Sequence, residues 1–257
     1  MAGRALSPVS VPALRVATLL GLWAVWEVAA RTGLFYEGVV PSSLLVLQSM
    51  ARHVVDPAFY AHAWRSIYEI GGGFGIGSVI GLVAGIALGA HRFSNTAAAP
   101  YIHGLASTPK IVFLPILMLL LGAGPASKIG MGAFSAFFPV VIAIAAGMGE
   151  INPVHVRVAR SFNASTWQIV RKVYLPSLIE PALTGMRLGL GVAIIGVLLA
   201  EIKFSDRGLG HLAIQHYNFF RVADMYAVLL LTFALAVLAN GLMSRVGTAL
   251  VRRKVTA

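Results

Sequence analysis

Long apolar stretches alternate with short polar ones along the chain. Three of the apolar stretches, residues 70–90, 129–149 and 225–244, contain no charged side chain. The rise in an α-helix is about 1.5 Å per residue, so each stretch reaches about 30 Å, the thickness of the hydrocarbon core of a membrane. Each stretch therefore predicts a membrane-spanning helix.

Three further stretches are apolar but less clean. Residues 16–30 include Glu27, residues 100–121 include Lys110, and residues 188–200 are long enough only if the helix starts near Ala182. With these three, the pattern predicts an all-α integral membrane protein with about six transmembrane helices, forming a single domain over residues 1–257. The predicted spans are 14–30, 68–90, 101–122, 128–148, 182–202 and 225–247.

The first apolar stretch has an alternative interpretation as a signal peptide. Arg4 and Arg15 precede it, and Val28-Ala29-Ala30 resembles a cleavage site. Two features favour a helix that is not cleaved. Glu27 lies inside the possible cleavage region, and the basic segment before the apolar stretch contains proline. Both interpretations stay open at this point.

The second span carries a regular series of glycines. One glycine at every fourth residue places the series along one side of a helix, where another backbone can approach closely. Ordinary helix packing is the first interpretation, and a flat surface along which helices slide during transport is the sharper alternative. The glycines are Gly73, Gly77, Gly81, Gly85 and Gly89.

Composition supports a membrane protein, because 58% of the residues are hydrophobic and 11% are charged. Soluble domains have roughly half apolar and a quarter charged residues. The net charge is +11, but no Lys/Arg run is longer than residues 252–254, so nucleic acid is not an expected partner. Lys and Arg are more numerous in the segments that are cytoplasmic if the amino terminus is inside, which predicts that both termini are cytoplasmic. The absence of cysteine excludes disulfides and thiolate metal sites.

One substantial polar segment, residues 150–181, separates the fourth and fifth spans. Its local signals predict a short helix, a turn and a second short helix. Asn152 is a good N-cap, and Pro153 after it suits the first helical position. Asn163 tolerates the left-handed backbone that ends a helix, and Ser165 with Gln168 forms a capping box for the next helix. Pro176 and Pro181 are expected to close the segment.

This segment resembles the EAA loop of ABC import permeases. The resemblance lies in Val158-Ala159-Arg160-Ser161-Phe162-Asn163-Ala164-Ser165, in Trp167-Gln168 and in Val173-Tyr174-Leu175-Pro176. Arg157-Val158-Ala159 stands where the family has Glu-Ala-Ala, Asn163 stands in place of a glycine, and Val173 in place of an isoleucine. Arginine at 157 reverses a charge at the docking surface, so the family's contacts are not carried over to that residue.

The resemblance extends over roughly residues 40 to 250 and is to the nitrate, sulfonate and taurine branch of these permeases. It is carried by Thr108-Pro109-Lys110-Ile111-Val112-Phe113-Leu114-Pro115, Leu121-Gly122-Ala123-Gly124, Ala136-Phe137-Phe138-Pro139, Thr184-Gly185-Met186-Arg187-Leu188, Ala200-Glu201 and Arg207-Gly208-Leu209-Gly210.

The resemblance implies a permease subunit of an ATP-driven importer in the bacterial inner membrane, surrounded by lipid. Such a permease pairs with a second copy or a close paralogue, receives its substrate from an extracytoplasmic binding protein, and is driven by a dimer of cytoplasmic ABC ATPase subunits. A small anionic nutrient, such as nitrate, a sulfonate, taurine or a related organic acid, is the expected substrate. The expected ATPase-coupling residues are Arg157, Ala159, Ser161, Asn163, Ala164, Trp167, Val170, Leu175 and Pro176.

The second helix of the loop has a face that could meet the ATPase. Trp167, Val170, Val173 and Tyr174 share that face at helical spacing. The alternative is that these side chains pack back on the permease's own helices.

Catalytic chemistry is not indicated by the sequence. Residues 122–128 resemble a phosphate-binding loop but lack the second glycine directly before the lysine, so ATP hydrolysis is expected from another polypeptide. No histidine spacing indicates a metal site, and no cofactor is expected on this chain. An ion-coupled secondary transporter or a channel is the alternative function, although no internal repeat of the kind such transporters have is visible.

Lys110 is the candidate residue for the translocation path. Read as a residue about ten positions into its span, it would lie near mid-depth, where an unpaired ammonium costs about 2.5 to 3.5 kcal/mol. It either faces a water-filled path or has a structural or interfacial role. Glu27, Arg187 and Glu201 lie nearer span ends, where snorkelling or local pairing accounts for them.

Overall fold

The structure is a computed structural model that describes residues 11–33 and 39–255. Arg4 and the carboxyl-terminal Ala257, on which part of the topology prediction rests, lie outside the described residues. The described secondary structure is helical throughout. In order, the helices are α1 (Val11–Arg31), α2 (Ser43–Val55), α3 (Pro57–Gly89), α4 (Arg92–Ser107), α5 (Leu114–Leu121), α6 (Pro125–Gly149), α7 (Pro153–Ser161), α8 (Thr166–Ile169), α9 (Leu175–Phe204), α10 (Leu209–Asn218) and α11 (Val222–Val255).

Five helical segments of the described chain are long and apolar enough to cross a membrane. They are α1, α3, α6, the continuous helix Thr166–Phe204, and α11. A sixth candidate span is the pair formed by α4 and the helical segment Lys110–Leu121, which together are long and apolar enough but meet at an angle of 93°. The predicted fold class, an all-α membrane protein with about six spans, is therefore confirmed.

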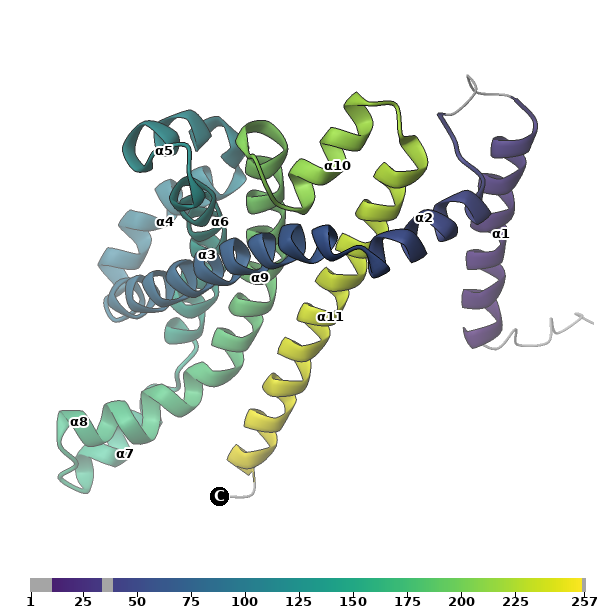
Figure 1. Ribbon diagram of the computed structural model, residues 1–257. Helices are drawn as coiled ribbons and strands as arrows, with labels where there is room; N and C mark the ends of the chain where they lie inside the picture. Colours follow the sequence, from purple (N-terminus) through teal and green to yellow (C-terminus); the bar gives the residue numbers. More distant parts are fainter. Residues whose placement is uncertain (1–10, 34–38, 256–257) are drawn as a thin grey trace, which may run out of the picture.

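Helix α6 forms the centre of the bundle. It packs along both α3 and α9, and Ala136, Val140 and Val141 on it are completely buried. In Figure 1, α7 and α8 protrude at the lower left, α10 lies at the top, and α1 stands apart at the right, connected through α2. The bundle core and the protruding hairpin are thus joined directly by α6 and α9.

The glycine series on α3 faces α6. A Cβ atom on Gly73 would lie 2.8 Å from the Ile129 carbonyl oxygen and 2.9 Å from the Cα atom of Gly132. A Cβ atom on each of the other four glycines would likewise lie less than 3.0 Å from an atom of α6; the nearest residues are Ala133, Phe137, Ile144 and Met148. Glycine is needed on this side because the two helix backbones touch. Sliding between the helices stays a prediction.

Helix α3 extends beyond the apolar stretch from which it was predicted. It begins at Pro57, where the Asp56 carboxylate accepts a hydrogen bond from the Ala58 amide at 2.9 Å, and not near residue 68. Two short helices, α2 and α10, were not predicted at all. A search for long apolar stretches does not find them because they have only 13 and 10 residues, fewer than a membrane span needs.

Helix α1 is tied to α2 through Glu27. The Glu27 carboxylate contacts the Arg31 guanidinium at 2.7 Å and accepts hydrogen bonds from the Ser43 amide and hydroxyl at 3.1 and 2.8 Å. The local pairing predicted for Glu27 is therefore present. Whether this segment is also a signal peptide stays open.

Candidate functional site

The hairpin between α6 and α9 has the capping contacts that the sequence predicts. The Asn152 side chain accepts a hydrogen bond from the Val154 amide at 2.9 Å, and Pro153 occupies the first turn of α7. At the second helix, the Ser165 amide donates to the Gln168 side chain at 2.8 Å while the Gln168 amide donates to the Ser165 hydroxyl. This is a complete capping box, so both helix starts are fixed locally.

The turn between the two helices is a Schellman motif centred on Asn163. Asn163 has φ of 54°, and its amide donates to the Arg160 carbonyl at 2.9 Å. The Ala164 amide donates to the Ala159 carbonyl at 3.1 Å, which closes the wider ring of the motif. The left-handed residue predicted at Asn163 is confirmed, and the two helices are joined by a defined turn.

The prediction that Pro176 and Pro181 close the hairpin is wrong. The helix runs without interruption from Thr166 to Phe204, through a π turn at Val170–Tyr174 in which the Leu175 amide reaches back to the Val170 carbonyl. A wider turn directly before Pro176 relieves the conflict between a proline ring and the preceding turn of a regular helix. Pro181 lies inside α9, where it packs against Gly147. The second hairpin helix is therefore an extension of a transmembrane helix.

The outer surface of the hairpin combines exposed aromatic and basic side chains. Phe162 is 81% exposed and Trp167 is 68% exposed. Val170, Val173 and Tyr174 are half-buried, so the predicted face divides, with Trp167 outward and the other three turned partly toward the chain itself. Exposed basic residues are Arg157, Arg160, Arg171 and Lys172.

The remaining predicted coupling residues occupy both sides of the hairpin. Ser161 is exposed and its hydroxyl donates to the Val158 carbonyl at 2.8 Å. Leu175 is 48% exposed. Ala159, Ala164 and Pro176 are half-buried. All nine predicted coupling residues thus lie in one protruding unit.

The span predicted for residues 101–122 coincides with a bent pair of helices, and Lys110 lies at the bend. Thr108 has extended backbone, with φ of −70° and ψ of 138°, because the residue before a proline disfavours helical geometry. Lys110 opens a 3-10 turn after Pro109, so it is not in the middle of a helix. Its ammonium donates to the Ala106 carbonyl at 2.7 Å and lies 5.5 Å from the centre of the Phe138 ring.

These contacts give Lys110 a structural partner at the end of α4. A cation near the last carbonyls of a helix stabilises that end. The sequence left a structural pairing open, and the ammonium has one. Contact between Lys110 and a substrate stays a prediction.

Replacing Lys110 with methionine tests that prediction. We expect uptake by the assembled transporter to fall severalfold in Lys110→Met, because the positive charge that would meet an anionic substrate is removed. Lys110→Arg keeps that charge and should retain most of the uptake. The measurement is uptake into proteoliposomes, with the amount of assembled complex as a control. Lys203→Met, a change at an exposed lysine, is the matched variant. Unchanged uptake in Lys110→Met would leave the residue with its structural role alone.

Sequence reasoning missed a buried polar cluster where α3, α9 and α10 meet. The Glu201 carboxylate is completely buried, and it accepts hydrogen bonds from the Ser66 hydroxyl at 2.6 Å and the Gly210 amide at 2.7 Å. The Leu209 amide in turn donates to the Ser66 hydroxyl at 2.8 Å. The cluster therefore anchors the start of α10 to two transmembrane helices.

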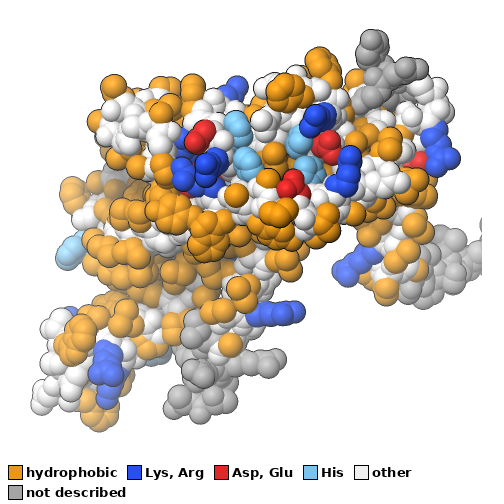
Figure 2. Space-filling view, in the orientation of Figure 1, with side chains coloured by type: hydrophobic (Ala, Val, Ile, Leu, Met, Phe, Trp, Pro, Cys, Tyr) orange, Lys and Arg blue, Asp and Glu red, His pale blue; other side chains and the backbone are white. Residues whose placement is uncertain are grey.

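Further charges lie beside this cluster. Glu69 is completely buried and pairs with Arg65 at 2.7 Å, and the buried ammonium of Lys128 donates to the carbonyls of Ala123 and Gly124. Figure 2 shows charged and histidine side chains gathered in the upper half of the view, with a wide hydrophobic belt beneath them. The Ala200-Glu201 pair was visible in the sequence, but its partner Ser66 lies 135 residues away. Among the described residues, no group of three or more His, Cys, Asp or Glu side chains could hold a metal ion.

Comparison with known proteins shows which membrane proteins this chain is similar to. Residues 77–256 match the family described as "binding-protein-dependent transport system inner membrane component". The taurine transport system permease protein TauC of Escherichia coli is 29% identical over 217 residues, which cover 82% of this chain and 78% of TauC. The nitrate import permease protein NrtB of Synechocystis is 24% identical over 228 residues, covering 85% of this chain and 81% of NrtB.

Two further similarities agree with these. The bicarbonate transport system permease protein CmpB of Synechococcus elongatus is 25% identical over 237 residues, covering 88% of this chain and 85% of CmpB. Among solved structures, an inward-facing conformation of the MetNI methionine ABC transporter superimposes with a TM-score of 0.62 at 23% identity, covering 74% of this chain and 93% of that chain. At 23% identity, this similarity supports the fold alone.

Proposed function

The chain belongs to the family of binding-protein-dependent transport system inner membrane components, and on that premise we propose that it carries a small anionic nutrient into the cell. It is a multi-pass inner membrane permease subunit of an ABC importer, and it is not itself an enzyme, since ATP hydrolysis belongs to a separate subunit. Because the chain belongs to this family, the alternative function of a secondary transporter or a channel is set aside.

An anionic substrate is supported by the relatives and by the charge of the chain. TauC, NrtB and CmpB are named for taurine, nitrate and bicarbonate, each a small molecule with an anionic group. Residues 70–149 of this chain, which include α4, α5 and α6, contain no Asp or Glu. An anion passing these helices meets no repelling carboxylate from them.

We propose that the hairpin α7–α8 docks on the ATPase and transmits its movement. The observation that carries this proposal is the continuity of α8 with α9. A hairpin fixed by caps at both helix starts and by a Schellman turn is stiff, and its second helix continues to Phe204. Displacement of the hairpin is therefore delivered directly to a transmembrane helix.

The assembly and orientation follow from the same proposal. The permease pairs with a second permease, identical or a close paralogue, beneath an extracytoplasmic binding protein, and both termini face the cytoplasm. The hairpin is then cytoplasmic and α10 extracytoplasmic. Reporter fusions at Asn163 and at Asp56 should report the cytoplasmic and the external side, respectively, and two fusions on the same side would contradict this orientation.

The test of the function uses the complete complex. The permease is purified with its ATPase and reconstituted into liposomes, and ATP hydrolysis is measured with binding protein that is empty or loaded with taurine, nitrate or bicarbonate. We expect one loaded form to stimulate hydrolysis and to drive uptake of its ligand. If no loaded binding protein changes the rate of ATP hydrolysis and no uptake is observed, the proposed function is contradicted.

A further inference from the structure

Four of the seven histidines gather at the end of the bundle where α2, α3 and α10 meet. Their rings form two pairs between helices. His53 of α2 meets His216 of α10 with the ring centres 5.2 Å apart, and His62 of α3 stacks on His211 of α10 at 6.2 Å. Figure 2 shows histidine side chains among the charged ones above the hydrophobic belt. Helix α10 therefore has a histidine contact with a different neighbouring helix near each of its ends.

The pair formed by His53 and His216 is packed away from solvent. His216 is buried, and the side chain of His53 is 12% exposed. The Nε2 atoms of both rings are buried and make no hydrogen bond within the described part of the chain. The ring of Phe59 also lies beside His53, with the ring centres 6.0 Å apart. The two imidazoles are thus packed as aromatic rings, which suits neutral side chains.

The carboxylate that faces this pair is already engaged. Asp224, in the first turn of α11, binds the Arg52 guanidinium at 3.0 Å through its Oδ1 atom. The same Oδ1 atom lies 3.7 Å from the Nε2 atom of His53. A proton on His53 would therefore compete with Arg52 for this oxygen, and a second proton on the pair would find no further carboxylate.

Protonation of His216 conflicts with its surroundings. A protonated imidazole carries an N–H on both nitrogens, and the Nε2 atom of His216 has no acceptor within the described residues. Burial lowers the pKa of His216 below its ordinary value near 6.5; Asp224 opposes this shift, whereas His53, Arg221 and His62 add to it. The packed structure therefore holds His216 neutral.

The turn that follows α10 is held in a strained conformation. The Arg221 amide donates to the His216 carbonyl at 2.9 Å, and the Phe220 amide donates to the Tyr217 carbonyl at 3.0 Å, so the helix ends in a Schellman motif. Phe220 occupies the left-handed position with φ of 55°, where glycine is usual and a bulky side chain costs free energy. A movement of the end of α10 relieves this strain, which makes the turn a suitable hinge.

We propose that the contact between His53 and His216 is sensitive to protons: two neutral rings hold the end of α10 against α2, and protonation of His216 at acidic pH separates them. The inference goes beyond the proposed function and does not depend on it. In the orientation proposed above, α10 is extracytoplasmic, so the contact would respond to the pH outside the membrane. Both α2 and α10 pack on α11, so their separation would also change the support of a transmembrane helix.

Opening of this contact should become easier as the pH falls. Once separated from its neighbours, His216 titrates near its ordinary pKa of about 6.5, whereas the packed ring stays neutral to lower pH. The open form therefore binds a proton that the packed form does not, and the free energy of opening decreases below about pH 6.5. Between about pH 7.5 and about pH 5.5, the open fraction should rise about tenfold.

Cysteine labelling measures this opening, because the natural chain contains no cysteine. Ala213→Cys lies on α10, about one turn before His216, at a buried position, and so reports whether α10 moves away from the bundle. The full permease, purified with its ATPase, is treated with a neutral dipyridyl disulfide. Each rate is divided by the reagent's rate with a free thiol at the same pH. Ala145→Cys, at a buried position of α6, is the control for general unfolding.

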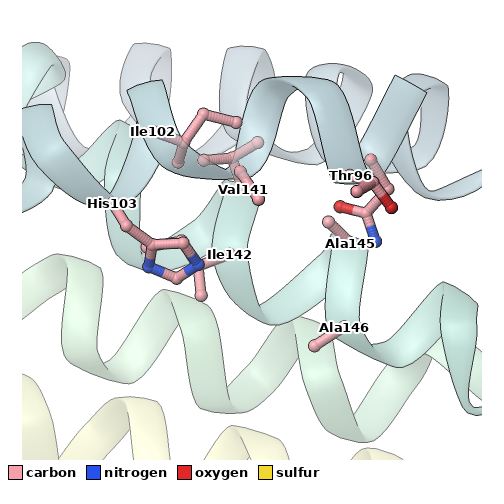
Figure 3. A pocket seen from close by; sticks show the side chains of 9 residues that line it. Thr96, Ile102, His103, Val141, Ile142, Ala145 and Ala146 are labelled. Atoms are coloured by element: carbon pink, nitrogen blue, oxygen red, sulfur yellow. The ribbon is translucent and has the colours of Figure 1, made fainter. Parts of the chain in front are cut away.

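Labelling of Ala213→Cys should be about tenfold faster at about pH 5.5 than at about pH 7.5, and labelling of Ala145→Cys should not change. Adding His216→Leu or His216→Gln should remove the difference, because neither side chain titrates. His103→Leu is the matched control and should keep the difference. His103 is exposed on α4, at one end of an open depression between α4 and α6 and away from the histidine pairs (Figure 3).

Three results would overturn the proposal. One is labelling of Ala213→Cys at equal rates at both pH values in a chain that keeps all its histidines. Another is acceleration at acidic pH that persists in both His216→Leu and His216→Gln, since a different group would then be titrating. The third is equal acceleration of Ala145→Cys, which would mean that acid loosens the whole bundle. None of these results concerns stimulation of the ATPase by loaded binding protein, on which the proposed function is tested.

Discussion

Asn163→Pro should abolish stimulation of ATP hydrolysis by loaded binding protein and should release the ATPase subunit during purification. Asn163 has φ of 54°, whereas proline is fixed near −65°. The change also removes the amide that donates to the Arg160 carbonyl at 2.9 Å. Backbone strain of about 1–3 kcal/mol and a lost hydrogen bond of about 1 kcal/mol together misdirect α7 against α8.

Asn163→Gly is the matched control for this change. Glycine adopts positive φ without steric cost and keeps the amide, so stimulation and retention of the ATPase should stay close to wild type. Insertion of both variants is checked by the amount of permease in the membrane. If Asn163→Pro inserts normally and keeps full stimulation and retention, the hairpin is not the coupling element.

The hairpin could be predicted from sequence because its contacts are local. The caps at Asn152 and Ser165 and the turn at Asn163 use partners within five residues, so the residue types alone specify them. The spans could be predicted for a similar reason, since a length of apolar helix needs no knowledge of its neighbours.

The prolines show where local reasoning fails. Pro109 does end a helix, although the apolar stretch that was predicted as one span continues beyond it. Pro176 and Pro181 do not end a helix, because a π turn and the space beside Gly147 accommodate them. Whether a proline breaks, bends or merely widens a helix depends on packing that the sequence does not display.

The polar cluster could not be predicted because it depends on distant contacts. Ser66 and Glu201 are 135 residues apart in the sequence, and their side chains meet only once α3 and α9 are packed together.

Gly73→Val should strongly destabilise the permease, by about 3 kcal/mol, the upper part of the range for overpacked cores. The three atoms nearest to a Cβ at Gly73 all belong to the backbone of α6: the Ile129 carbonyl oxygen at 2.8 Å, the Gly132 Cα at 2.9 Å and the Ala133 nitrogen at 3.1 Å. Backbone atoms cannot rotate away as a side chain can, so α3 and α6 must separate. Separation would also expose the buried face of α6.

Gly75→Val separates packing from helix propensity. Gly75 lies on the same helix, and a Cβ there meets nothing within 4 Å. Both variants change glycine to the same residue, so a difference between them reports contact with α6. Thermal unfolding of the purified permease in detergent should show a lower melting temperature and a lower yield for Gly73→Val than for Gly75→Val. Equal melting temperatures would mean that the two helices can move apart at little cost, which would favour the interpretation of this surface as one along which helices slide.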